Sequence, residues 1–263
     1  MDQEQLKEYL DALVSRYNHS SFIESDPISI PKQFSLKQDI EITAFWTAML
    51  AWGRRATIIS KAQELFDRMD GRPYDFILNH SEEERKGFLS FKHRTFQADD
   101  TLYFLHFLQK IYRQFDSLEE AFLINGENRG IEAGLINFYN LFTGDDLMPG
   151  RTKKHVSTPS RNTACKRLNM FLRWMVRKDE AGVDFGIWSR LAMKDLMIPL
   201  DVHVGKVARR LGLLARPQDD WRSVLELTGR LQSMNPADPV SYDYALFSLG
   251  VEGVMEDLPG RGH

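Results

Sequence analysis

The sequence is poor in cysteine and has no long apolar run. Its 263 residues include one cysteine, Cys165, which excludes an internal disulfide and any four-cysteine iron–sulfur cluster or zinc site. No stretch approaches the roughly 20 apolar residues that a membrane helix needs, and the N-terminus is polar and amphipathic, unlike a signal peptide. We therefore expect a cytoplasmic protein with no membrane contact, no iron–sulfur cluster, no metal and no other cofactor.

Acidic residues are absent from residues 147–178, a stretch that holds nine lysines and arginines. The whole chain carries a formal net charge of −3, so its composition as a whole is not that of a nucleic-acid binder. A local basic surface can still bind a polyanion, because each neutralised phosphate releases counterions. A charge run is more often a solvated face. Both interpretations stay open at this point.

Apolar residues recur at intervals of three and four along most of the chain, for example within 168–175. No stretch shows the sustained two-residue alternation of a half-buried strand. Glycine, proline and asparagine lie between the apolar stripes, where helices should end. The sequence predicts an all-α protein, with its longest loop over residues 142–160 and a second irregular segment over residues 25–34.

The most informative segment is Ile198–Leu211, which reads IPLDVHVGKVARRL. Pro199 disfavours helical backbone at the residue before it, so a helix should begin near Asp201. An aspartate there can accept hydrogen bonds from the free N–H groups of the first turn. Asp201 is predicted to be an N-cap, and the same position would fix its carboxylate in place for chemistry.

A second segment, Asn162–Arg177, reads NTACKRLNMFLRWMVR and predicts a helix with Lys166 one turn inside it. Lys166, Asn169 and Arg173 lie on a different side from the apolar face. An amine near apolar bulk and beside Arg167 would have its charged form disfavoured, which makes it a nucleophile. Most helix lysines are instead solvated.

These segments resemble the helix-hairpin-helix DNA glycosylase superfamily. The resemblance is carried by KRLNMFL at 166–172, PLDVHV at 199–204 and ARRLGL at 208–213. It covers residues 160–214 well and the rest of the chain weakly. It implies that Asp201 is the catalytic aspartate and Lys166 the Schiff-base lysine of bifunctional members, with His203 and Asn169 as further motif residues.

Departures from the superfamily pattern indicate a particular branch. The four cysteines of its iron–sulfur members are missing, and residues 159–165 replace the usual glycine hairpin. Lys166 and Asp201 are 35 positions apart, which predicts an extra helix over about 184–197. The archaeal 8-oxoguanine glycosylase branch resembles this arrangement most. Similar KRLNMFLRWMVR and P-L-D-x-H-V strings occur in an uncharacterised bacterial domain-of-unknown-function family, of which the chain is identified as a member.

The resemblance implies one two-lobed helical unit over residues 1–263, a bundle like that of the superfamily. Its lobes would be residues 1–40 with 200–263, and residues 41–199, with the hairpin-like element near 150–178. The implied function is a DNA glycosylase of base excision repair with AP-lyase activity, which flips out a damaged base such as an oxidised purine.

In the implied mechanism, Lys166 attacks the sugar C1′. Asp201 helps to deprotonate the amine and stabilises positive charge on the sugar. The side chains implied to contact DNA are Arg161, Asn162, Thr163, Arg167, Arg54 and Arg55. Those implied for the substrate pocket are Trp52, Asn169, Trp188 and His203.

Some of these residues also have a simpler interpretation as structural residues. Trp52 is a pocket candidate because it lies beside the Arg54-Arg55 turn, yet tryptophans such as Trp52 and Trp188 are more often core residues. His203 has no His or Cys partner at metal-binding spacing and is more often structural. Two other function classes remain: a catalytically silent nucleic-acid-binding protein, and a helical interaction module whose basic stretch docks an acidic partner.

Overall fold

The computed structural model describes residues 2–251, and within them the backbone forms helices joined by loops, without a strand. The all-α prediction is confirmed. The α-helices are α1 (Gln3–Tyr17), α2 (Lys37–Leu50), α3 (Arg55–Asp67), α4 (Pro73–Asn79), α5 (Glu82–Lys86), α6 (Ala98–Tyr112), α7 (Ile131–Thr143), α8 (Lys166–Val176), α9 (Val202–Arg210), α10 (Trp221–Met234) and α11 (Tyr242–Val251). Short 3₁₀ helices fill several connections, including the irregular segment expected over residues 25–34.

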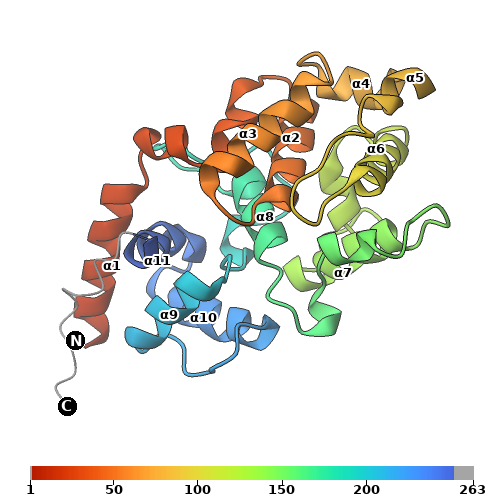
Figure 1. Cartoon of the computed structure of the whole chain (residues 1–263). Coiled ribbons are helices and arrows are strands. Elements are labelled where there is room, and N and C mark those ends of the chain that lie inside the picture. The colour runs from red at the N-terminus through yellow and green to blue at the C-terminus, as the bar shows by residue number, and fades with distance from the viewer. Residues whose placement is uncertain (1, 252–263) are drawn as a thin grey trace.

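The helices pack in two groups (Figure 1). In one group, α11 contacts both α1 and α9, and α10 lies beside them. In the other, α2 contacts α3, α4 and α8, while α6 contacts α4. Every residue of α2 from Ile40 to Leu50 is buried, as expected for a helix that is covered on all sides. The buried apolar side chains of both groups form one contiguous core.

A buried carboxylate, that of Glu41, ties α2 to three other parts of the chain. It accepts hydrogen bonds from the Tyr112 hydroxyl at 2.8 Å, the Leu118 amide at 3.0 Å and the Trp188 indole at 2.6 Å, as well as from the Ser117 hydroxyl. A carboxylate is stable in a core only when its oxygens are bonded in this way. The indole of Trp188 is therefore a structural donor.

The extra helix predicted over residues 184–197 does not form. The segment is irregular apart from the short 3₁₀ helix Met193–Asp195. Gly182 and Gly186 adopt positive φ, which breaks any regular helix. The amides of Phe185 and Trp188 bond to the carbonyls of Trp174 and Met175 at 2.8 and 2.9 Å. The segment thus satisfies the last carbonyls of α8 instead of coiling on itself.

The helix expected from Asn162 begins only at Lys166, so Lys166 is the first residue of α8 and not one turn inside it. Asn162 and Cys165 both adopt left-handed backbone, with φ of 53° and 50°. L-residues do not continue a right-handed helix through that conformation.

The acid-free stretch 147–178 is not one basic surface. Arg173 and Arg177 are buried and form ion pairs with Asp184 at 3.3 and 3.1 Å. Arg151 pairs with buried Asp100 at 2.9 Å. Acidic residues from elsewhere in the sequence thus neutralise part of the stretch. Its exposed cations are Lys154, Arg161 and Lys178.

Across residues 2–251 there is no helix of the length and apolarity that a membrane crossing requires.

Replacing Glu41 with alanine should lower the free energy of unfolding by about 3 kcal/mol or more, because several buried donors lose their acceptor at once. Urea denaturation of the variant measures this loss. Glu8 is exposed in the middle of α1, and its replacement by alanine should change stability by no more than about 0.5 kcal/mol. Equal small effects at both positions would show that Glu41 is not a structural anchor.

Candidate functional site

A cleft of about 470 Å³ lies between the two helix groups. One side is formed by the α2–α3 connection and the first half of α8, and the other by the starts of α9 and α11. Its volume is in the range of small-molecule sites. Lys166 and Asp201, which the sequence singled out, both line it.

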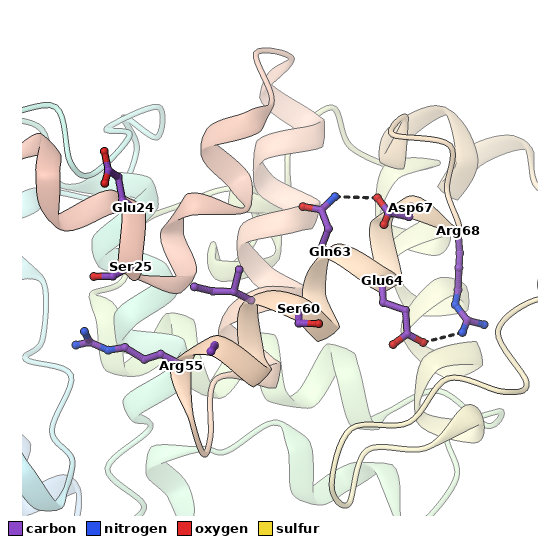
Figure 2. A pocket seen from close by; sticks show the side chains of 10 residues that line it. Glu24, Ser25, Arg55, Ser60, Gln63, Glu64, Asp67 and Arg68 are labelled. Atoms are coloured by element: carbon purple, nitrogen blue, oxygen red, sulfur yellow. Dashed lines mark hydrogen bonds and ion pairs between the residues drawn. The ribbon is translucent and has the colours of Figure 1, made fainter.

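A larger hollow of about 1200 Å³ lies along α3 and is more open to solvent (Figure 2). Several of its polar groups satisfy one another: Glu64 pairs with Arg68 at 2.7 Å, and Gln63 donates to Asp67 at 2.8 Å. Arg55 lines both this hollow and the cleft. The cleft is the better functional candidate, since it brings together an amine, three carboxylates and arginines.

Lys166 reaches the cleft from the first turn of α8 and is half-buried. Its Nζ lies 3.5 Å from the sulfur of Met170, which is a weak acceptor. Among the residues that the structure describes, no carboxylate lies within ion-pair distance of this amine. The amine therefore has no internal ion pair in the described chain that a ligand in the cleft would have to displace.

Asp201 caps α9, as predicted. Its backbone is extended, and its Oδ1 accepts hydrogen bonds from the amides of His203 at 2.9 Å and Val204 at 3.0 Å. Both bonds use the same oxygen, and none from residues 2–251 reaches Oδ2. The cap thus fixes the carboxylate at the cleft wall and leaves one oxygen for another partner.

Two further carboxylates, those of Asp26 and Asp243, line the cleft and were not anticipated from the sequence. Burial raises the pKa of the Asp243 carboxyl to about 6, although Arg173 and Lys166 act to lower it. Burial also raises the pKa of Asp26, whose Oδ1 accepts from the amide of Ile28 at 3.0 Å. An aspartate set among the apolar residues of a helix was the signal that could have pointed to Asp243.

Arg167 brings a positive charge into the cleft without a carboxylate partner in the described chain. Its guanidinium donates to the carbonyl of Met49 at 2.6 Å and lies 5.0 Å from the Trp52 ring centre. Burial lowers its pKa to about 10, so the group remains charged at neutral pH. A partly desolvated cation of this kind favours an anionic ligand.

Trp52, which was assigned to a substrate pocket, lines the cleft, but its ring is packed against other side chains. The His93 ring centre lies 5.1 Å away, and His155 stacks on the indole at 5.9 Å. With Arg167 also over the ring, Trp52 acts as part of the wall that positions the guanidinium.

Arg55 and His203 line the cleft, whereas Arg54 does not. The Arg55 guanidinium lies 4.7 Å from the ring centre of Phe247 of α11, which joins the two helix groups. Arg54 is exposed and precedes the first turn of α3. The basic turn thus contributes one of its two arginines to the cleft.

Three of the residues implied to contact DNA, Arg161, Asn162 and Thr163, lie on a turn before α8 and do not line the cleft. Asn162 donates to Asp220 at 3.0 Å, and Thr163 donates to the carbonyl of Thr158 at 2.9 Å. Arg161 is exposed on the same turn.

Asn169 and Trp188 also lie away from the cleft. The Asn169 side chain is buried and donates to the carbonyl of Ala164 at 3.1 Å, while Trp188 donates to Glu41 in the core. The pocket assignment of these two residues is corrected, because their amide and indole groups serve internal acceptors.

Within the part of the chain that the structure describes, no three His, Cys, Asp or Glu side chains gather closely enough to hold a metal ion.

Fold and site together define an all-helical protein with a cleft that combines an amine with carboxylates. Residues 26–252 match the family model described as "Protein of unknown function (DUF2400)", and the chain belongs to this uncharacterised family. The identification with the helix-hairpin-helix DNA glycosylase superfamily is corrected, because the match is to this family and no glycosylase family model matches. No curated protein and no solved structure matches the chain.

The contribution of the Asp201 cap to stability can be measured with two substitutions. Asp201→Ala should lower the free energy of unfolding by about 1 kcal/mol, since the α9 amides lose their acceptor. Asp201→Asn keeps an oxygen at the cap and should change stability by only a few tenths of a kcal/mol. Urea unfolding of both variants checks this. Equal losses would mean that the charge, and not the cap hydrogen bonds, stabilises α9.

Proposed function

We propose that the cleft is the active site of a DNA glycosylase with an AP-lyase step. The proposal is drawn from the site and not from membership of any glycosylase superfamily. One observation carries it: Lys166 and Asp201 are 35 positions apart and come from different helices, yet they line one cleft of nucleotide-like size. An amine that shares a cleft with a fixed carboxylate suits attack on a sugar carbon that gains positive charge.

In this mechanism Lys166 attacks C1′ of the deoxyribose and the base leaves. The sugar ring then opens to a Schiff base on Lys166, which permits strand cleavage by β-elimination. Asp201, fixed by two amides of α9, places a negative charge beside the sugar as positive charge develops there. A charge that is already in position needs no reorganisation during the reaction.

The cations of the cleft support a nucleic-acid substrate. Arg167 carries no internal ion pair in the described chain, and Arg55 lies at the junction of the cleft and the α3 hollow. Both can contact backbone phosphates, which positions the strand without reading its sequence. A base bound in the cleft must first leave the duplex, which costs a few kcal/mol and less for a damaged base.

The proposal treats the two helix groups as the two lobes expected from the sequence, with substrate bound between them. A protein-interaction module is less favoured, because the arginines of the basic stretch that are buried bond to internal aspartates. A catalytically silent DNA-binding protein is separated from the enzyme by the Lys166 variant below.

Lys166→Ala should abolish the covalent adduct that sodium borohydride traps between the protein and duplex DNA carrying an abasic site. The reason is that the trapped species is a reduced Schiff base on the amine. Lys206, an exposed lysine of α9, serves as the matched control, and Lys206→Ala should trap as much adduct as wild type. Adduct that persists in Lys166→Ala, or none with wild type over a panel of damaged duplexes, would contradict the proposal.

Arg167→Ala should weaken DNA binding. It should also reduce the magnitude of the slope of log K against log salt concentration by about 1, which is the contribution of one phosphate contact. Fluorescence anisotropy at several salt concentrations measures the slope. Arg113, exposed at the end of α6, is the control, and Arg113→Ala should leave the slope unchanged. An unchanged slope for Arg167→Ala would show that this guanidinium only supports Trp52.

A further inference from the structure

We propose that Arg94, on the connection between α5 and α6, is a phosphate-binding residue at the rim of the cleft and is positioned there against Gly53. The inference rests on the proposed function and extends it. Arg94 belongs to neither Asn162–Arg177 nor Ile198–Leu211, so none of the motifs in the sequence pointed to it. It adds a contact to the DNA backbone that lies outside the cleft itself.

The turn that carries Arg94 is held in place at both ends. The amide of His93 donates to the carbonyl of Phe96, and the amide of Phe96 donates to the carbonyl of His93, both at 2.9 Å. His93 and Phe96 are buried, whereas Arg94 and Thr95 between them are exposed. Arg151 donates to the Thr95 carbonyl at 3.1 Å. A turn fixed in this way presents the Arg94 guanidinium with little backbone entropy left to lose on binding.

Arg94 packs directly against Gly53 of the α2–α3 connection, and Gly53 lines the cleft. A Cβ added to Gly53 would lie 2.6 Å from Nη1 of Arg94, which is well inside van der Waals contact. Gly53 has a φ of 108°, and Arg94 has a φ of 54°. A residue other than glycine seldom adopts a positive φ, and such strained backbone clusters at functional sites. The glycine thus lets the guanidinium reach the rim of the cleft.

Arg94 also completes a group of arginines around the α2–α3 connection. Arg54 and Arg55 lie at the end of this connection, and Arg167 lies 5.0 Å from the ring centre of Trp52 within it. Among the residues that the structure describes, none of these four arginines forms an ion pair. Like charges gathered without carboxylate partners repel one another, and a bound polyanion relieves that repulsion.

A DNA strand fits this arrangement better than a small anion does. Arg94 is exposed and does not line the cleft, although it touches a residue that does. A small ligand bound in the cleft would leave Arg94 unused. When one nucleotide of a strand occupies the cleft, the backbone continues in both directions and its flanking phosphates lie at the rim. Arg94 and Arg167 approach neighbouring residues of one connection and can each contact a phosphate there.

The test measures binding to a duplex that carries a tetrahydrofuran abasic analogue, which cannot form a Schiff base. At about 0.1 M salt, Arg94→Ala should weaken binding about fivefold to tenfold, and it should reduce the magnitude of the slope of log K against log salt concentration by about 1. Arg94→Lys should keep the wild-type slope, because the charge is kept. Exposed Arg113 is the control, and Arg113→Ala should bind as wild type does. An unchanged slope in Arg94→Ala would overturn the inference.

The role of Gly53 is tested in the same assay. Gly53→Ala should displace the guanidinium and reduce the slope as Arg94→Ala does, and it should have no further effect when combined with Arg94→Ala. Gly71 is the matched control, since it also has a positive φ, of 64°, but its Cβ would meet nothing within 4 Å. Gly71→Ala should leave binding unchanged. A full effect of Gly53→Ala in the absence of Arg94 would contradict the positioning of Arg94 by Gly53.

Borohydride trapping by the wild-type protein, with a true abasic site, tests the proposed function separately. If wild type gives the adduct but Arg94→Ala binds DNA as wild type does, only the inference about Arg94 is wrong. If Arg94→Ala loses its share of the salt dependence but wild type gives no adduct, Arg94 is a DNA contact and the lyase step is wrong. Wild type that binds no DNA would overturn both. If Gly53→Ala does not fold, the two Arg94 variants still decide whether Arg94 binds phosphate.

Discussion

The burial of Arg173 of α8 and of Arg177, which follows α8 directly, is the constraint on which the arrangement of the site depends. A guanidinium removed from water is stable only when carboxylates compensate its charge. Arg173 pairs with Asp184 and Asp243, and Arg177 pairs with Asp184 and Asp238. Burial alone would lower the pKa of Arg173, whereas these carboxylates raise it above its usual value. The pairs fasten three separate parts of the chain to α8.

This network also decides which charges remain for a ligand. It occupies arginines that would otherwise make residues 147–178 a basic surface, and it pulls the segment after α8 into an irregular path along that helix. The cations that are left at the cleft are Lys166, Arg167 and Arg55. They come from the first turns of α8 and α3, where the positive end of each helix dipole already disfavours cations. An anion bound between them would relieve that cost.

The sequence predicted the features that depend on local interactions. Helical periodicity located α8 and α9, and the Pro-Leu-Asp order located the cap at Asp201, because both depend on residues within one or two turns. Features set by distant partners were missed. Asp243 joins the cleft through an arginine 70 positions away, and Trp188 enters the core through Glu41, 147 positions away. Spacing in the sequence carries no signal for such pairs.

Two of the carboxylates that line the cleft, those of Asp201 and Asp243, are held in contrasting ways. A carboxylate that accepts backbone amides is fixed in place at the start of its helix. A carboxylate buried beside an arginine is subject to two opposing effects, since desolvation favours its protonated form and the ion pair favours its charged form. Asp201 has the first environment and Asp243 the second. The fold places both carboxylates on the wall of the cleft that Lys166 also lines, one held by backbone amides and the other by a buried arginine.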